Sequence, residues 1–107
     1  YEVLDLNLKN TELVVLSACE TSLASYNYTG SDVNSLQRSF RMAGTKAVLA
    51  SKWKVPDKQT GELMTEFYTN WLVNKMTKHQ ALQQAQLTLR KKYPEPYYWA
   101  AWVLYGE

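Results

Sequence analysis

The stretch Glu-Leu-Val-Val-Leu-Ser, residues 12–17, decides how this sequence folds. It holds four consecutive apolar residues, two of them β-branched, and such a run is typical of a short strand that is buried on both faces, as in a parallel sheet covered by helices. Cys19 stands two residues beyond Ser17, where the polar stretch 20–32 begins. The sequence therefore predicts a buried strand with a thiol just past its carboxyl end, followed by a long loop.

Downstream of this strand, the spacing of the apolar residues predicts helices in some segments and strands in others. Apolar residues recur at helical spacing from Val33 to Ala43, Ser31 or Asp32 is expected to cap that helix, and Gly44 stands where a left-handed residue would end it. The remaining elements are expected to be a strand over 46–53, a long helix with an apolar stripe over 63–76, a third helix opened by a capping box over 77–80, and a last strand over 97–105.

The order strand, helix, strand, helix, helix, strand predicts an α/β fold. Strand–helix–strand crossovers place the first two strands parallel, and reactive groups in open α/β sheets gather beyond the carboxyl ends of such strands. Cys19 and the loop 53–57 both follow a predicted strand in this way. A sheet of three strands would leave an apolar edge exposed, so we expect further chain upstream of Tyr1 to cover it.

Composition and charge exclude several classes of protein. The chain has 107 residues, of which 46% are hydrophobic and 21% charged, which fits one soluble globular unit. The longest apolar runs are far shorter than the roughly 20 residues of a membrane span, so no membrane is expected. A single cysteine and a single histidine argue against a disulfide framework and against a metal centre. No metal or cofactor is expected, and the lone thiol fits a cytoplasmic setting.

Cys19 has two interpretations on sequence grounds. A lone cysteine is more often a small packed residue, whereas a thiol that emerges at a strand end can act as a nucleophile if a base, normally histidine, stands beside it. The only histidine, His79, falls at the start of the third predicted helix and is interpreted as a solvent-facing residue. If Cys19 is catalytic, we therefore expect its base to lie outside this sequence.

Residues 13–23, Leu-Val-Val-Leu-Ser-Ala-Cys-Glu-Thr-Ser-Leu, closely resemble the nucleophile segment of CHAT domains, the caspase-like peptidase domains found with tetratricopeptide repeats. The resemblance continues in order through nearly the whole chain. It takes in Leu36, Phe40, Ala43-Gly44, 48–51, 53–57, Leu63-Met64, Phe67-Tyr68, Ala81-Leu82, Ala85-Gln86, 97–102 and Gly106. Ala24, 30–32, Lys54 and Pro56 depart from the family pattern, and all of them fall in expected loops, whereas Trp53, Val55 and Asp57 keep the pattern.

The resemblance implies a caspase/hemoglobinase-like three-layer α/β/α sandwich whose last strand is antiparallel. Residues 1–107 would be the C-terminal part of a single CHAT domain, with the upstream half absent. It further implies a cysteine endopeptidase of the caspase-like clan, in which Cys19 attacks a protein or peptide substrate and a His-Gly motif upstream supplies the general base. Tetratricopeptide repeats are expected as partners, and nucleic acid is not. The alternative is a catalytically inactive CHAT-type domain that serves as a protein–protein interaction module.

Three further residues are expected to bind substrate: Ser17, Trp53 and Asp57. Trp53 either lines the substrate groove or packs in the core. Asp57 either caps the long helix, a role that suits aspartate, or faces a basic side chain of the substrate. The basic residues 90–92 are interpreted as a solvated helix end, where positive charge is favoured by the helix dipole.

Overall fold

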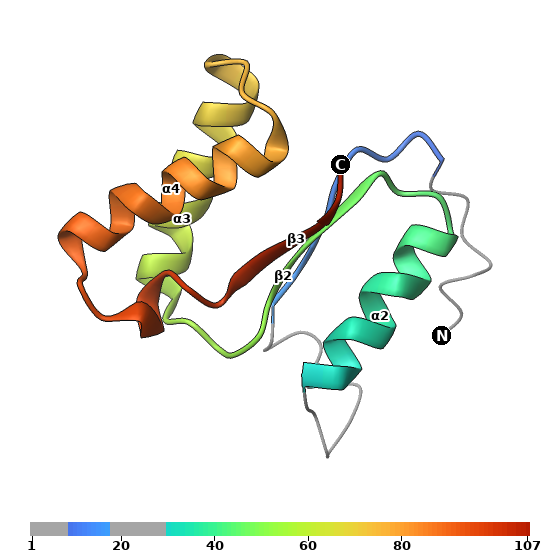
Figure 1. Cartoon of the computed structure of the whole chain (residues 1–107), viewed down its shortest axis with the longest axis horizontal. Helices are drawn as coiled ribbons and strands as arrows, with labels where there is room; N and C mark the ends of the chain where they lie inside the picture. Colours follow the sequence, from blue (N-terminus) through green and yellow to red (C-terminus); the bar gives the residue numbers. More distant parts are fainter. Residues whose placement is uncertain (1–8, 18–29) are drawn as a thin grey trace. The chain divides into compact units, whose positions relative to one another are not determined.

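The computed structural model describes residues 9–17 and 30–107, with side chains placed from residue 36 onward in the second range. The elements follow the predicted order of strand, helix, strand, helix, helix, strand (Figure 1). They are β1 (Val14–Leu16), α2 (Gly30–Met42), β2 (Ala47–Ser51), α3 (Asp57–Tyr68) continued by the π-helical turn η2 (Thr69–Val73), α4 (Lys78–Lys92), the 3-10 turn η3 (Pro96–Tyr98) and β3 (Trp102–Gly106). The predicted α/β class is confirmed.

The three strands form one mixed sheet in the order β1-β2-β3. β1 and β2 are parallel, with Val14 opposite Val48 and Leu16 opposite Ala50. β3 runs the other way, so that its last residue, Gly106, lies beside the start of β2. Both the parallel pair and the antiparallel last strand were predicted, and β2 lies between its two neighbours.

The chain divides into two compact units. The first, here called the sheet unit, comprises residues 1–54 and 103–106 and contains β1, α2, β2 and most of β3. Its core consists of four buried residues from β1, α2 and β2: Leu16, Phe40, Val48 and Ala50. Four partly buried residues pack against this core: Val14, Leu36, Ala43 and Tyr105. β2 is buried along its whole length. The fold thus fixes the two parallel strands through a shared core under α2.

The second unit, here called the hairpin unit, comprises residues 55–102 and Glu107. Its helices α3 and α4 lie side by side (Figure 1). Each buries apolar side chains: Leu63 and Phe67 of α3, and Ala81, Ala85 and Leu89 of α4. The capping box at the start of α4 is confirmed, since the backbone N–H of Gln80 donates to Oγ1 of Thr77 at 3.1 Å and Oε1 of Gln80 accepts from the backbone N–H of Thr77 at 3.2 Å.

Two predicted helix boundaries change. α2 already begins at Gly30, so Ser31 and Asp32 fall inside the helix and not before its first residue, as the prediction had placed one of them. At its other end Gly44 has a φ of 118°, and the predicted left-handed termination is confirmed. The long helix passes into a π-helical turn after Tyr68, and this turn leaves Leu72 and Val73 exposed. The apolar stripe predicted to reach residue 76 therefore buries fewer residues than the sequence suggests, because Leu72 faces solvent.

The last strand is shorter than the predicted range 97–105, because its first part folds into η3. Pro96 occupies the first position of that turn, where its fixed φ suits a helical residue. The N–H groups of Tyr98 and Trp99 then donate to the carbonyls of Glu95 and Pro96, both at 3.2 Å. These local hydrogen bonds use backbone groups that a strand would need for its ladder, and β3 begins only at Trp102.

Candidate active site

The carboxyl ends of β1 and β2 form one edge of the sheet unit. Leu16 ends β1 opposite Ala50, so Ser17 leaves β1 where Ser51 ends β2. Parallel strands lie about 4.8 Å apart, and Trp53 stands two residues beyond the end of β2. Ser17 and Trp53 are both half-buried. The structure therefore brings two of the predicted substrate-binding residues to the same edge, as the parallel arrangement requires.

Cys19, the predicted nucleophile, lies outside the described residues. What the structure describes is the strand that leads to it. Leu16, three residues before the thiol, is only 7% exposed and packs into the core with Phe40 and Val48. This packing fixes where the chain leaves β1, and the chemistry predicted for Cys19 stays a prediction.

Asp57 belongs to the hairpin unit, where it is the first residue of α3. The prediction that it caps this helix is wrong. Pro56 holds the N-cap position, with a φ of −54° and a ψ of 146°, and no side chain there accepts a hydrogen bond from the helix. The carboxylate of Asp57 instead stands in the first turn, where the helix dipole favours negative charge. It is exposed, so the other interpretation, a carboxylate facing a basic substrate side chain, stays a prediction.

His79 lies in the first turn of α4, within the hairpin unit, and its side chain is exposed. The predicted solvent-facing position is confirmed. A histidine in this place is explained by the capping box that surrounds it, since Thr77 and Gln80 on either side hold the helix start.

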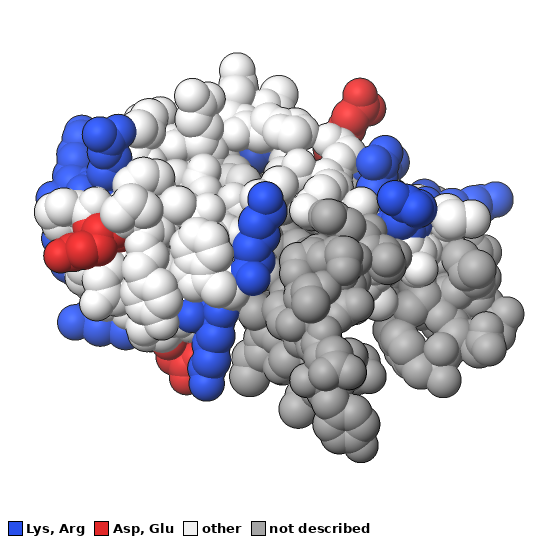
Figure 2. All heavy atoms as spheres, turned by 60° about the horizontal axis from the view of Figure 1, so that its bottom comes forward, with Lys and Arg blue, Asp and Glu red and all other residues white. Residues whose placement is uncertain are grey.

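Among the described charged groups, one ion pair lies in the sheet unit. Nζ of Lys46 lies 2.8 Å from the carboxylate of Glu12, and this hydrogen bond and the opposite charge raise the pKa of Lys46. The pair stands at the amino end of β2, the end opposite to Trp53. In the view of Figure 2 the Lys and Arg side chains lie in several groups over the surface, with a few acidic side chains among them.

Sequence reasoning missed a second polar cluster, which lies in the hairpin unit. The hydroxyl of Tyr93 donates to Oε1 of Glu62 at 2.8 Å, and Nζ of Lys92 reaches Oε2 of the same carboxylate at 3.3 Å. The hydrogen bond from Tyr93, followed by that from Lys92, lowers the pKa of Glu62. About thirty positions separate the partners in the sequence, and no local spacing pattern could have paired them, because only the packing of α3 on α4 brings them together.

The part of the chain that the structure describes holds no group of three or more His, Cys, Asp or Glu side chains that could bind a metal ion. Within the same residues, no helix is both long enough and apolar enough to cross a membrane.

Comparison with known proteins adds one positive finding. The family model of the CHAT domain matches residues 1–107, which is the whole chain. No curated protein and no solved structure matches it. The family match covers the strand β1, the segment that carries Cys19 and both units, so it agrees with the resemblance noted in the sequence.

Proposed function

This chain belongs to the CHAT family, and from that premise we propose that it carries the nucleophile of a caspase-like cysteine endopeptidase, Cys19. The observation that supports the proposal best is the parallel pairing of β1 with β2. It gives the segment that precedes Cys19 a fixed exit at the carboxyl edge of the sheet, where α/β proteins assemble their reactive groups.

In the proposed reaction, the thiolate of Cys19 attacks the carbonyl carbon of a peptide bond. The tetrahedral intermediate collapses, the C–N bond breaks, and the leaving amine takes a proton from the histidine that had deprotonated the thiol. Water, deprotonated by the same histidine, then hydrolyses the thioester and restores the thiol. The backbone N–H of Cys19 would stabilise the oxyanion, a contribution that is worth about a hundredfold or more in rate. The histidine is supplied by chain outside this sequence.

Substrate contacts are proposed for three residues. Ser17 and Trp53 flank the edge from the ends of neighbouring strands, and the half-buried indole of Trp53 offers an apolar wall to a substrate side chain. Asp57, exposed in the first turn of α3, would face a basic side chain. Tetratricopeptide repeats in the full-length protein would control access, and a reducing compartment such as the cytoplasm would keep the thiol active.

The decisive experiment compares Cys19→Ala with His79→Ala in the full-length protein, using cleavage of a library of peptidyl-aminomethylcoumarin substrates. Cys19→Ala should lower the rate by about a thousandfold or more, as loss of a nucleophile does in proteases. His79→Ala should keep the rate near that of the wild type, because His79 is exposed at the start of α4. Cleavage that survives in Cys19→Ala would overturn the mechanism, provided that both variants melt at the wild-type temperature.

The rival function is a CHAT-type domain that binds proteins without cleaving them. Thiol reactivity separates the two functions even when no substrate is known. An activated Cys19 should react with iodoacetamide faster than a free cysteine does at neutral pH, since its base lowers the pKa of the thiol. A rate equal to or below that of free cysteine, in a full-length protein without an upstream His-Gly, would instead favour the binding module.

A further inference from the structure

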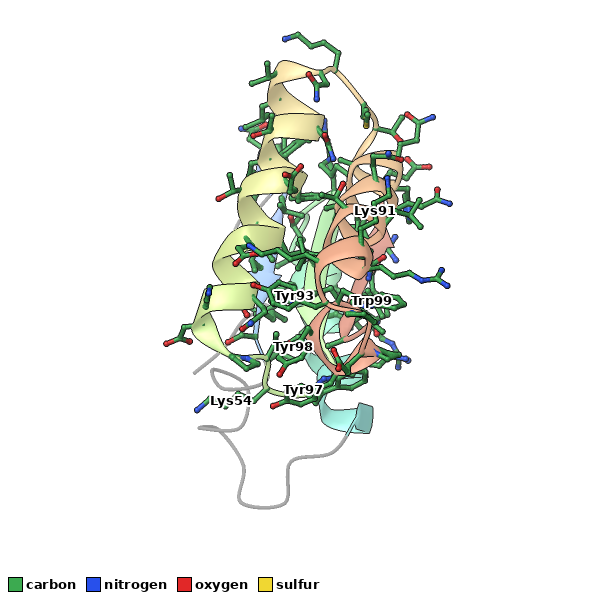
Figure 3. All side chains as sticks on the ribbon, turned by 90° about the vertical axis from the view of Figure 1, so that its left-hand side faces the viewer. Lys54, Lys91, Tyr93, Tyr97, Tyr98 and Trp99 are labelled. Atoms are coloured by element: carbon green, nitrogen blue, oxygen red, sulfur yellow. The ribbon has the colours of Figure 1, made fainter. Side chains whose placement is uncertain are left out.

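Four aromatic side chains gather where α4 ends and η3 begins, and they are here called the aromatic surface: Tyr93, Tyr97, Tyr98 and Trp99 (Figure 3). The ring centroids of Tyr93 and Tyr98 are 5.3 Å apart, and those of Tyr98 and Tyr97 are 5.2 Å apart in an edge-to-face contact. These spacings are within the favourable range for aromatic pairs. Tyr97 is 50% exposed, so the row of rings runs from the partly buried Tyr93 to the solvent.

The aromatic surface is held in place by polar contacts from within the hairpin unit. Glu62 accepts hydrogen bonds from the hydroxyl of Tyr93 at 2.8 Å and from Nζ of Lys92 at 3.3 Å. Nε2 of Gln86 donates to the carbonyl of Trp99 at 2.9 Å and to that of Trp102 at 3.0 Å. A partner that binds such a surface need not order these rings, and avoiding that entropic cost favours affinity.

The last turn of α4 places positive charge next to these rings. Arg90 lies over the ring of Trp99, 5.8 Å from its centroid, and Lys92 lies 5.4 Å from that of Tyr93. Lys91, between them, is exposed. Since Lys92 is paired with Glu62, Lys91 and Arg90 provide the charge that a partner would meet, and Glu95 is an exposed acidic residue within the same segment. The charge balance favours an anionic partner with a small number of acidic groups.

We infer that the aromatic surface binds an acidic segment of another protein, which packs a ring side chain against Tyr97 and places its carboxylates near Lys91 and Arg90. Tyrosine, tryptophan and arginine are the residue types enriched in the energetically dominant parts of protein interfaces. A nucleic acid fits less well, because binding to phosphates needs several uncommitted cations. Here Lys92 is paired with Glu62, so Arg90 and Lys91 are the two cations of this surface that would meet a partner, which is few for a run of phosphates. The inference is independent of Cys19.

The test measures binding of the full-length protein to a fluorescein-labelled copolymer of glutamate and tyrosine by fluorescence anisotropy. Poly-glutamate, which lacks rings, and single-stranded oligo(dT) serve as comparison probes. Tyr97→Ala should weaken binding of the copolymer about tenfold, the loss expected from one aromatic stacking contact of about 1.4 kcal/mol. Lys91→Glu should weaken it severalfold, and the loss should shrink as salt rises.

Matched controls come from exposed residues elsewhere in the hairpin unit. Tyr68→Ala removes a partly exposed tyrosine of α3, and Lys75→Glu reverses an exposed charge beyond η2. Both variants should bind the copolymer as the wild type does. The inference is overturned if the copolymer does not bind, or if Tyr97→Ala and Lys91→Glu bind it as tightly as the controls do. It is also overturned if oligo(dT) binds more tightly than the copolymer through these same two residues.

Discussion

Residues 13–17 and 47–51 are alike as sequence, since both combine apolar residues with a final serine, Leu-Val-Val-Leu-Ser in one and Ala-Val-Leu-Ala-Ser in the other. In the structure they differ. Every residue of β2 is buried, whereas in β1 only Leu16 is buried and Val14 and Val15 are partly exposed. β2 has a hydrogen-bonded neighbour on each side, while among the described strands β1 pairs with β2 alone. Position in the sheet, rather than composition, decides how deeply each strand is buried.

The difference assigns separate tasks to the two strands. β2 is the more rigidly held strand, since all five of its residues are buried in a closely packed core. β1 is positioned by its register on β2 and by one well-buried side chain, Leu16. The predicted nucleophile follows β1, the less buried of the two.

Truncating side chains on the two strands should give the largest measurable contrast. Leu49 and Val15 face each other in the register, but Leu49 is fully buried and Val15 is not. Leu49→Ala should lower the free energy of unfolding by about 2–5 kcal/mol, because it leaves a cavity in a packed core. Val15→Ala should cost about 1 kcal/mol, since less apolar area is lost. Urea denaturation of both variants measures the contrast, and equal losses would mean that β1 is as deeply buried in solution as β2.

The other side of β2 can be tested through Gly106, the last residue of β3. Its φ is 93°, and a Cβ there would run into the carbonyl oxygen of Lys46 and lie 3.2 Å from Cα of Ala47. Gly106→Ala should therefore lower the free energy of unfolding by about 1–3 kcal/mol, through backbone strain and displacement of β3 from β2. Gly61→Ala is the matched control, because nothing lies within 4 Å of its added Cβ. That substitution, inside α3, should raise the melting temperature. A Gly106→Ala variant that melts at the wild-type temperature would show that β3 does not hold β2 closely.

The smallest effect is expected at the amino ends of β1 and β2, where Lys46 and Glu12 form an exposed pair. Pairing raises the pKa of Lys46, through the hydrogen bond to Glu12 first and the opposite charge second. The stabilisation is therefore present at neutral pH and is lost as the pH rises through the raised pKa of Lys46. Lys46→Met should shift the melting temperature only slightly at neutral pH, and high salt should shrink that shift. A large shift that salt leaves unchanged would mean that the pair holds the strands together.

Much of the fold could be predicted because local signals agree with it. Three of these signals each involve only a few neighbouring residues: the apolar runs of β1 and β2, the capping box at Thr77 and the left-handed Gly44. They can therefore be recognised in the sequence alone. The predictions that are wrong concern the ends of elements, where an adjacent residue takes the predicted place or starts a different turn. Asp57 was expected to cap α3, but Pro56 takes that place, and the turn that begins at Pro96 delays the last strand to Trp102.

By itself, the sequence determined the element order, the parallel pair of strands, the place of Cys19 after the first strand and the resemblance to CHAT domains. These follow from periodicity and short motifs, which act between residues close in the chain. Only the tertiary structure decided that β2 is buried and β1 half-exposed, and that Glu62 holds Tyr93 and Lys92 at one end of a row of rings that reaches the solvent at Tyr97. Burial depends on what packs against both faces and both edges of a strand, and a carboxylate meets a tyrosine some thirty positions away only after α3 and α4 have packed together.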